Sequence, residues 1–104
     1  MPIVVVATMT AKPESVDTVR DACKQAIEAV HQESGCELYA LHEADGTFVF
    51  VEQWADADAL TAHSKAPAVA TLFGTIGEHL DGAPDIKMLQ PVVAGDPAKG
   101  ALRP

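Results

Sequence analysis

Basic side chains are scarce in this sequence of 104 residues. Seven Lys and Arg stand against 15 Asp and Glu, which gives a formal net charge of −8 at pH 7. Proteins that bind nucleic acid or an anionic membrane surface neutralise phosphate groups with clusters of Lys and Arg, and the sequence has no such cluster. We therefore expect neither nucleic acid nor a membrane among the partners.

Long apolar runs are missing as well. The longest run near the start covers residues 3–7, and the first basic residue is Lys12. A secretory signal needs basic residues ahead of its apolar segment, and a membrane-spanning helix needs about 20 apolar residues. Neither pattern is present, so we expect a cytoplasmic protein.

Residues that hold metals or cofactors are few and scattered. The two cysteines, Cys23 and Cys36, have no CxxC spacing, which argues against a disulfide framework and against a structural zinc site. No two histidines have the i, i+4 or HxH spacing of a metal site. None of the seven glycines forms the GxGxxG loop with which flavin and nicotinamide enzymes normally hold phosphate. We expect no metal and no cofactor.

Apolar residues, by contrast, make up 48% of the sequence. This is enough for one folded domain, and the chain is too short for two cores. The last residues contain Pro and Gly without hydrophobic periodicity, which is typical of an unpacked chain end. We predict one domain over residues 1–93 and a flexible tail over residues 94–104.

The start of the sequence predicts a strand followed by a helix. Residues 3–10 are β-branched and apolar on both parities, as in a strand that is covered on both faces. Pro13 suits the first turn of a helix, and apolar residues then recur at spacings of three and four until the Ser34-Gly35 pair.

The dipeptide Asp45-Gly46 is the strongest local signal, because its residues suit the positive φ angles of a type I′ hairpin turn. It joins two strand-like runs, residues 36–44 and 47–55. A two-residue turn fixes the register, so position 39 should face position 52. The residues predicted on one face of this hairpin are Tyr39, Leu41, Phe48, Phe50, Glu52 and Trp54.

The second half of the sequence predicts two helical segments and a last strand. Asp56 should cap a short helix, and after Pro67 apolar residues follow helical spacing as far as Leu80. Residues 86–92 then alternate as a strand that contains a proline, which suits a strand end or a sheet edge. The order β, α, β, β, α, β is the ferredoxin-like, split βαβ arrangement of an α+β fold with an antiparallel sheet.

Two helical segments cover only one face of a four-stranded sheet. The other face of the hairpin is also largely apolar, and an uncovered apolar face of that size drives association. We therefore expect a homodimer that forms through this sheet face.

Three segments resemble the antibiotic biosynthesis monooxygenase family: ESGCELY at residues 33–39, FVEQWAD at residues 50–56, and ALTAH at residues 59–63, with Pro67 after them. The resemblance covers roughly residues 2–92. It implies a dimeric α+β barrel. It also implies membership of a family that includes cofactor-independent monooxygenases of polyketide phenols, quinol monooxygenases and haem-degrading enzymes.

The sequence departs from two branches of that family. The haem-degrading branch carries an Asn, a Trp and a His at places that correspond to Ala7, Trp54 and Leu72, so only the Trp matches and the axial ligand for iron is missing there. The polyketide-oxidising branch has an Asn four residues before the Trp, where this sequence has Phe50. The resemblance therefore leaves the substrate open.

Three residues are candidates for catalysis. His63 follows Asp56 and Ala59 at helical spacing and should point inward, either as a base in a pocket or as a half-buried histidine bonded to a backbone carbonyl or across the dimer. Glu52 is an acid on an aromatic face, where burial would raise its pKa and suit it as a base, unless it lies at a solvated edge paired with Lys65 or Arg20. Trp54 either stacks on a planar substrate or anchors the strand end.

Three aromatic residues are candidates for binding a small aromatic ligand. Tyr39 offers a hydroxyl that would position a substrate oxygen, although a tyrosine on a sheet face is often simply part of the core. Phe50 and Phe73 would form apolar walls of a pocket, and such walls also belong to the core.

Our first hypothesis is a cofactor-independent monooxygenase of a small, electron-rich phenol or quinol, in which the resemblance implies that the substrate itself supplies electrons to O₂. The protein must then contribute a base, a dry pocket and a fixed pose. The alternatives are a non-catalytic dimeric module that binds a small molecule, and isomerase or decarboxylase chemistry that consumes no O₂.

Overall fold

Four strands form one antiparallel sheet in the spatial order β2-β3-β1-β4. The computed structural model describes residues 1–103 of the chain. The strands are β1 (Ile3–Thr10), β2 (Cys36–Ala44), β3 (Thr47–Trp54) and β4 (Asp85–Leu89). This topology confirms the α+β, ferredoxin-like fold expected from the sequence.

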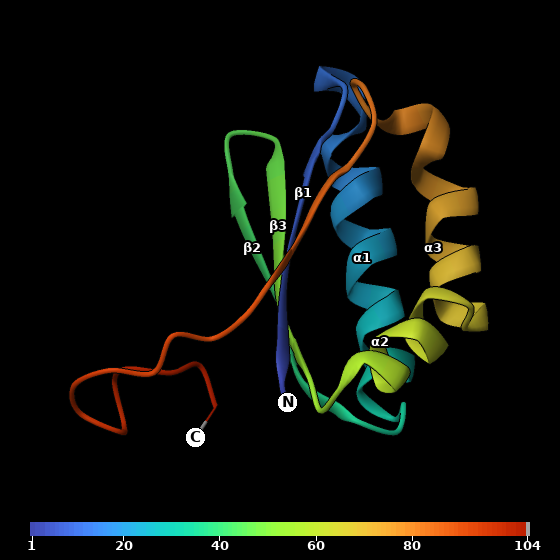
Figure 1. Cartoon of the computed structure of the whole chain (residues 1–104). Helices are drawn as coiled ribbons and strands as arrows, with labels where there is room; N and C mark the ends of the chain where they lie inside the picture. The colour runs from blue at the N-terminus through green and yellow to red at the C-terminus, as the bar shows by residue number, and fades with distance from the viewer. Residues whose placement is uncertain (104) are drawn as a thin grey trace.

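Three helices lie on the same side of this sheet (Figure 1). They are α1 (Val16–His31), α2 (Ala57–Ser64) and α3 (Pro67–Ile76), with short 3₁₀ turns at Pro13–Ser15 and Gly77–His79. The predicted cap of the second helix is confirmed, because the Asp56 carboxylate accepts a hydrogen bond from the backbone N–H of Ala59 at 2.8 Å. No helix among residues 1–103 is both long enough and apolar enough to cross a membrane.

The hairpin between β2 and β3 has the geometry that its turn sequence predicts. Asp45 and Gly46 have φ angles of 50° and 78°, as a type I′ turn requires. Tyr39 pairs with Glu52, so the predicted register is confirmed. The alternation along β3 therefore sends Phe48, Phe50, Glu52 and Trp54 toward the helices, where all four are buried.

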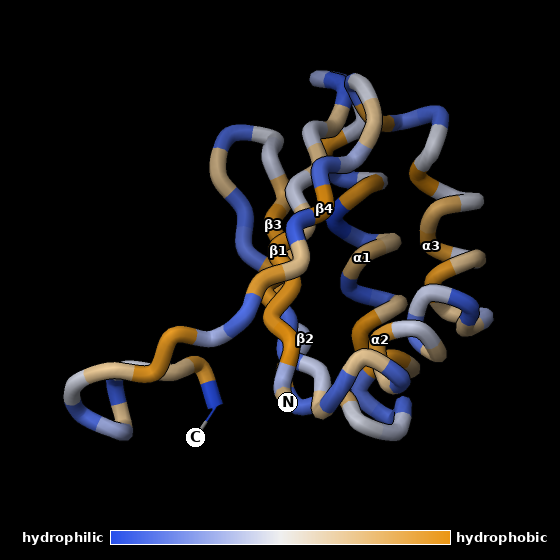
Figure 2. The backbone as a smooth tube through the Cα atoms, in the orientation of Figure 1, coloured by the Kyte–Doolittle hydropathy of each residue, from blue (hydrophilic) through white to orange (hydrophobic). Residues whose placement is uncertain are grey.

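The two faces of the sheet are covered to different extents. The face under the helices carries the core of the protein, including Val5 and Met9 of β1. Apolar strands run through the centre of the molecule, and the helices cover them from one side (Figure 2). We call the other side the open face. It carries the alternate, half-buried residues Val4, Val6, Leu38, Ala40, Val49 and Val51.

The last strand is shorter than the sequence predicts. Our prediction extended it to Val92, but β4 ends at Leu89, which pairs with Val4 of β1. Pro91 has no backbone N–H to continue the ladder. Residues 90–103 contain no helix or strand and lie on the side of the sheet away from the helices (Figure 1), where the backbone carbonyl of Arg103 accepts a hydrogen bond from the Gln53 side chain of β3 at 3.4 Å. The division into a domain and a flexible tail stays a prediction.

Candidate active site

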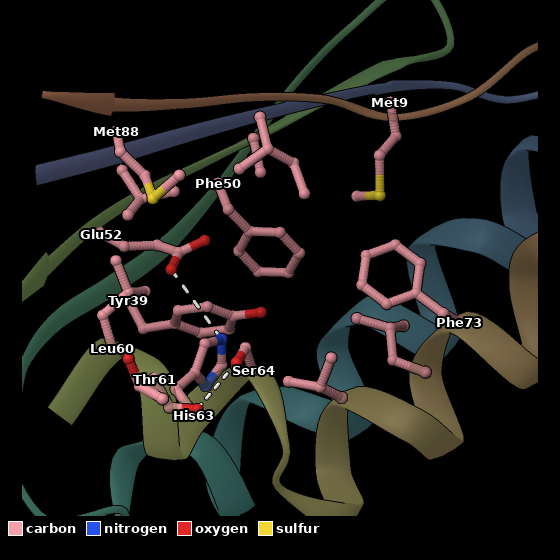
Figure 3. A pocket seen from close by; sticks show the side chains of 15 residues that line it. Met9, Tyr39, Phe50, Glu52, Leu60, Thr61, His63, Ser64, Phe73 and Met88 are labelled. Carbon is pink, nitrogen blue, oxygen red and sulfur yellow. Dashed lines mark hydrogen bonds and ion pairs between the residues drawn. The ribbon is translucent and has the colours of Figure 1, made fainter. Parts of the chain in front are cut away.

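A cavity of about 460 Å³ lies between the sheet and helices α2 and α3 (Figure 3). It is mostly apolar, and its polar side chains gather near the end formed by α2. Ile86 and Met88 of the edge strand β4 also line it, although they are 52% and 68% exposed. The remaining lining residues are Val5, Ala7, Met9, Tyr39, Phe50, Glu52, Leu60, Thr61, His63, Ser64, Val69, Leu72 and Phe73.

His63 reaches this cavity from the last turn of α2 and is only 8% exposed. The turn that follows α1 packs closely against α2 at Gly35. This glycine has a φ of 84°, and a Cβ there would lie 2.5 Å from the Cβ of Ala59. Its carbonyl also accepts a hydrogen bond from the backbone N–H of Ala55 at 2.9 Å. The close approach brings the end of α1 beneath His63.

The close packing at Gly35 places Glu33, just after α1, beside His63. Its Oε1 lies 2.8 Å from His63 Nδ1, and its Oε2 is buried without a hydrogen-bond partner among the described residues. An ionised Glu33 accepts the Nδ1–H of the imidazole, which leaves the lone pair of a neutral His63 on Nε2. Nε2 lies 3.9 Å from Oε1 of Glu52 across the cavity end. His63 thus has one nitrogen held and the other available.

Trp54 lies behind these groups and is absent from the cavity lining. It is fully buried, its ring centroid is 4.3 Å from that of His63, and its indole N–H donates to Glu52 Oε1 at 2.9 Å. The indole N–H is therefore already engaged within the protein. Trp54 fixes the positions of the two groups that do face the cavity.

Burial controls the charge of two cavity groups. It raises the pKa of the Glu52 carboxyl, while the hydrogen bond from Trp54 and the neighbouring His63 oppose that rise. Burial also raises the pKa of the Tyr39 phenol, and the nearby Glu52 adds to the effect. Tyr39 therefore stays protonated and remains a hydrogen-bond donor at neutral pH.

The aromatic residues predicted to bind ligand occupy two parts of the cavity. Tyr39 stacks on Phe50 with ring centroids 4.4 Å apart. Its hydroxyl points into the cavity (Figure 3). Phe73 lies with Met9 at the end away from His63 (Figure 3). The cavity therefore has a polar end and an apolar end.

The two cysteines are not reactive thiols. Both cysteines are free thiols, and burial raises the pKa of Cys23 to about 11 and that of Cys36 in the same direction. Thiols in such surroundings are protonated and unreactive. Among the residues that the structure describes, no three His, Cys, Asp or Glu side chains are arranged to hold a metal ion.

Five of the six residues singled out in the sequence line one cavity: Tyr39, Phe50, Glu52, His63 and Phe73. The sixth, Trp54, supports them from behind. The alternative of a solvated, paired Glu52 is wrong, because this residue is only 4% exposed and Arg20 instead binds Glu43 and Asp17. Their roles in binding and catalysis stay predictions.

Sequence reasoning missed Glu33. Thirty positions separate it from His63, and no local periodicity relates the two residues. Two signals were available: Glu33 begins a segment that resembles the family, and the glycine two positions later marks a close approach of the backbone to another element.

The sequence matches the model of a known protein family. Residues 2–73 match the family model described as "Antibiotic biosynthesis monooxygenase". No curated protein matches the chain.

Several solved structures have the same fold. A protein of Mycobacterium tuberculosis superimposes with a TM-score of 0.85 at 24% identity, covering 92% of this chain and 100% of its own. A conserved protein from Methanosarcina mazei has a TM-score of 0.82 at 28% identity and covers 86% of this chain and 92% of its own. A crystal structure named as an antibiotic biosynthesis monooxygenase has a TM-score of 0.81 at 29% identity. The superposition covers 86% of this chain and 98% of that protein.

Proposed function

The chain belongs to the antibiotic biosynthesis monooxygenase family, and from that membership we propose that it oxidises a small, electron-rich phenol or quinol with O₂ and without a cofactor. The observation that carries this proposal is His63, whose Nδ1 is held by Glu33 at 2.8 Å while Nε2 faces a largely apolar cavity. An imidazole held in this way is suited to act as a general base.

The first step is removal of a proton from the substrate hydroxyl by His63 Nε2. An ordinary phenol has a pKa of about 10 and an ordinary imidazole one of about 6.5, so the transfer costs about 5 kcal/mol unless the site stabilises the products. Glu33 stabilises the imidazolium that forms. The protonated hydroxyl of Tyr39, which points into the cavity, is available to donate to the phenolate. These two groups lower the cost at both ends of the transfer.

The phenolate then reduces O₂. One electron passes to O₂, and the resulting radical pair forms a C–O bond. The peroxide takes the proton back from His63 and then loses water, with a hydrogen from the same ring carbon, to give a quinone. One oxygen atom enters the ring and the other leaves as water, with all four electrons supplied by the substrate. The protein contributes the proton transfer, the pose and the exclusion of water, for which the apolar walls Phe50 and Phe73 are suited.

We also propose that two copies of the chain pair through the open face. Its central positions are apolar, and Val51 of β3 lies between Val6 of β1 and Ala40 of β2 in the strand register. None of the helices among residues 1–103 covers these side chains. A second sheet of the same kind is the complementary surface that would bury them.

The test of the oxidation is O₂ uptake with a panel of 1-naphthol, 1,4-naphthoquinol and hydroxyanthracenes, with ¹⁸O₂ used to follow the oxygen. We expect uptake above the rate of autoxidation, one ¹⁸O atom in each product molecule, and no hydrogen peroxide. His63→Ala should lower kcat by about 100-fold to 10,000-fold.

The matched control is His79→Ala, because His79 is absent from the cavity lining and lies beside Ser15 instead. It should leave turnover within about twofold of the unchanged protein. Panel compounds that bind without consuming O₂ would favour a binding module over an enzyme. If the His63 variant and the unchanged protein turned over at equal rates, His63 would not be the base.

A further inference from the structure

The polar end of the cavity contains acids and no fixed cation. Glu52 lines it, and Glu33 lies directly behind His63. None of the 15 lining residues in the described chain is Lys or Arg. Two basic residues adjoin lining residues in the sequence but are not part of the lining: Lys65, which is exposed, and Lys87, which binds Asp85.

Counting protons gives the net charge of this end. Two ionised carboxylates, Glu33 and Glu52, beside a neutral imidazole have a charge of −2. One added proton, on His63 or on Glu52, reduces the charge to −1. Either way the cluster repels an incoming anion, and the surrounding apolar walls screen this repulsion poorly.

An uncharged phenol avoids that repulsion because it brings its own proton. When His63 takes this proton, the phenolate faces a new imidazolium, and the net charge of the cavity is unchanged. A substrate that arrives as a carboxylate adds one negative charge for which the site has no counterion. Tyr39, which is only 5% exposed and has a hydroxyl that points into the cavity, offers a single neutral donor instead.

We propose that this cavity selects uncharged hydroxyaromatic molecules and rejects those that carry a carboxylate next to the hydroxyl. The inference deepens the proposed function and rests on it, because it takes this cavity as the substrate site. The far end of the cavity has no group that could stabilise a carboxylate, because Met9, Leu72 and Phe73 supply only apolar contacts. A carboxylate beside the reacting hydroxyl therefore has to lie near Glu52.

Three naphthalene compounds of related shape test the selection: 2-naphthol, 3-hydroxy-2-naphthamide and 3-hydroxy-2-naphthoate. The amide matches the carboxylate in size and in its internal hydrogen bond but is uncharged. Binding is measured by calorimetry at pH 7 under nitrogen, so that no turnover occurs. We expect the amide to bind at least tenfold more tightly than the carboxylate. Glu52→Gln should reduce this ratio by at least threefold, because its amide keeps the shape and removes an acid.

The outcomes separate the inference from the proposed function. A carboxylate that binds as tightly as the amide overturns the charge selection, even if the enzyme oxidises 1-naphthol. Clear selection in a protein that consumes no O₂ supports the inference and contradicts the oxidation. If none of the three compounds binds, the cavity is not a site for hydroxyaromatic molecules and both proposals fail.

Discussion

Neighbouring residues of β3 face two different surroundings. Phe48 and Phe50 lie under the helices and are at most 1% exposed, whereas Val49 and Val51 point to the open face and are only half-buried. The covered face encloses acids, an imidazole and a phenol among its apolar residues. On the open face, Val6, Ala40 and Val51 form an apolar row, with Lys87 of β4 beside Val6 and Thr8 of β1 beside Val49.

The difference shows that the two faces of this small sheet are suited to different roles. A buried polar group destabilises a protein unless it is hydrogen-bonded, so His63 and Glu52 are costly residues for a core. Each has a partner, but Oε2 of Glu33 is buried without one among the described residues, and the Tyr39 hydroxyl points into the cavity. Such an arrangement is typical of a functional site. The open face, by contrast, is suited to association.

Removing a side chain from the covered face should have the largest effect. Phe48 is fully buried beneath α1 and is not part of the cavity lining. Phe48→Ala should lower the free energy of unfolding by about 3–5 kcal/mol, because it leaves a hole in the core. Urea denaturation followed by circular dichroism measures the loss. Val49→Ala, next to it on the open face, should cost less than about 1.5 kcal/mol; equal losses would contradict the contrast between the faces.

A charge on the open face should act on assembly. Val51→Lys places an ammonium at the centre of the proposed interface, where pairing would strip it of water without a partner. We expect the dissociation constant of the dimer to rise at least about 100-fold, or about 2.7 kcal/mol. Sedimentation equilibrium should then give the 10.9 kDa mass of one chain. An unchanged protein that is already monomeric at micromolar concentration would refute the proposed dimer.

A smaller effect should come from Glu33, which acts on the cavity through His63. Glu33→Gln keeps the shape of the side chain but removes the charge that stabilises the imidazolium. We expect kcat to fall by about 10-fold to 100-fold, with KM changing by less than about threefold. The control is Glu28→Gln on the exposed side of α1, which should leave both constants unchanged. A rise in KM with kcat unchanged would show that Glu33 serves binding rather than proton transfer.

The smallest effect should appear in the pH dependence of stability. Burial raises the pKa of Glu52 in the folded chain. The free energy of unfolding therefore falls as the pH rises from the ordinary pKa of a glutamic acid to the raised pKa of Glu52. The stability associated with the protonated acid is fully present below this pH range and is lost above it. Glu52→Gln should therefore gain stability relative to the unchanged protein as pH increases, and then level off. Urea titrations between pH 4 and 8 test this, and a constant difference would argue against a buried, neutral-preferring acid.

Much of the fold could be predicted because its determinants are local. Asp45-Gly46 sets the hairpin register, and alternation from there places Tyr39 opposite Glu52 on the covered face. Helical spacing sends His63 inward in the same way. The contact of His63 with Glu33 is different in kind, since it depends on how α1 and α2 pack at Gly35. No periodicity within either helix encodes that packing.

The most direct test of His63 as the base is a crystal structure with 1-naphthol bound under nitrogen. We expect a naphthol oxygen within about 3.2 Å of His63 Nε2, with the rings extending toward Phe73. A naphthol whose oxygen lies at the Phe73 end of the cavity, away from His63, would contradict it.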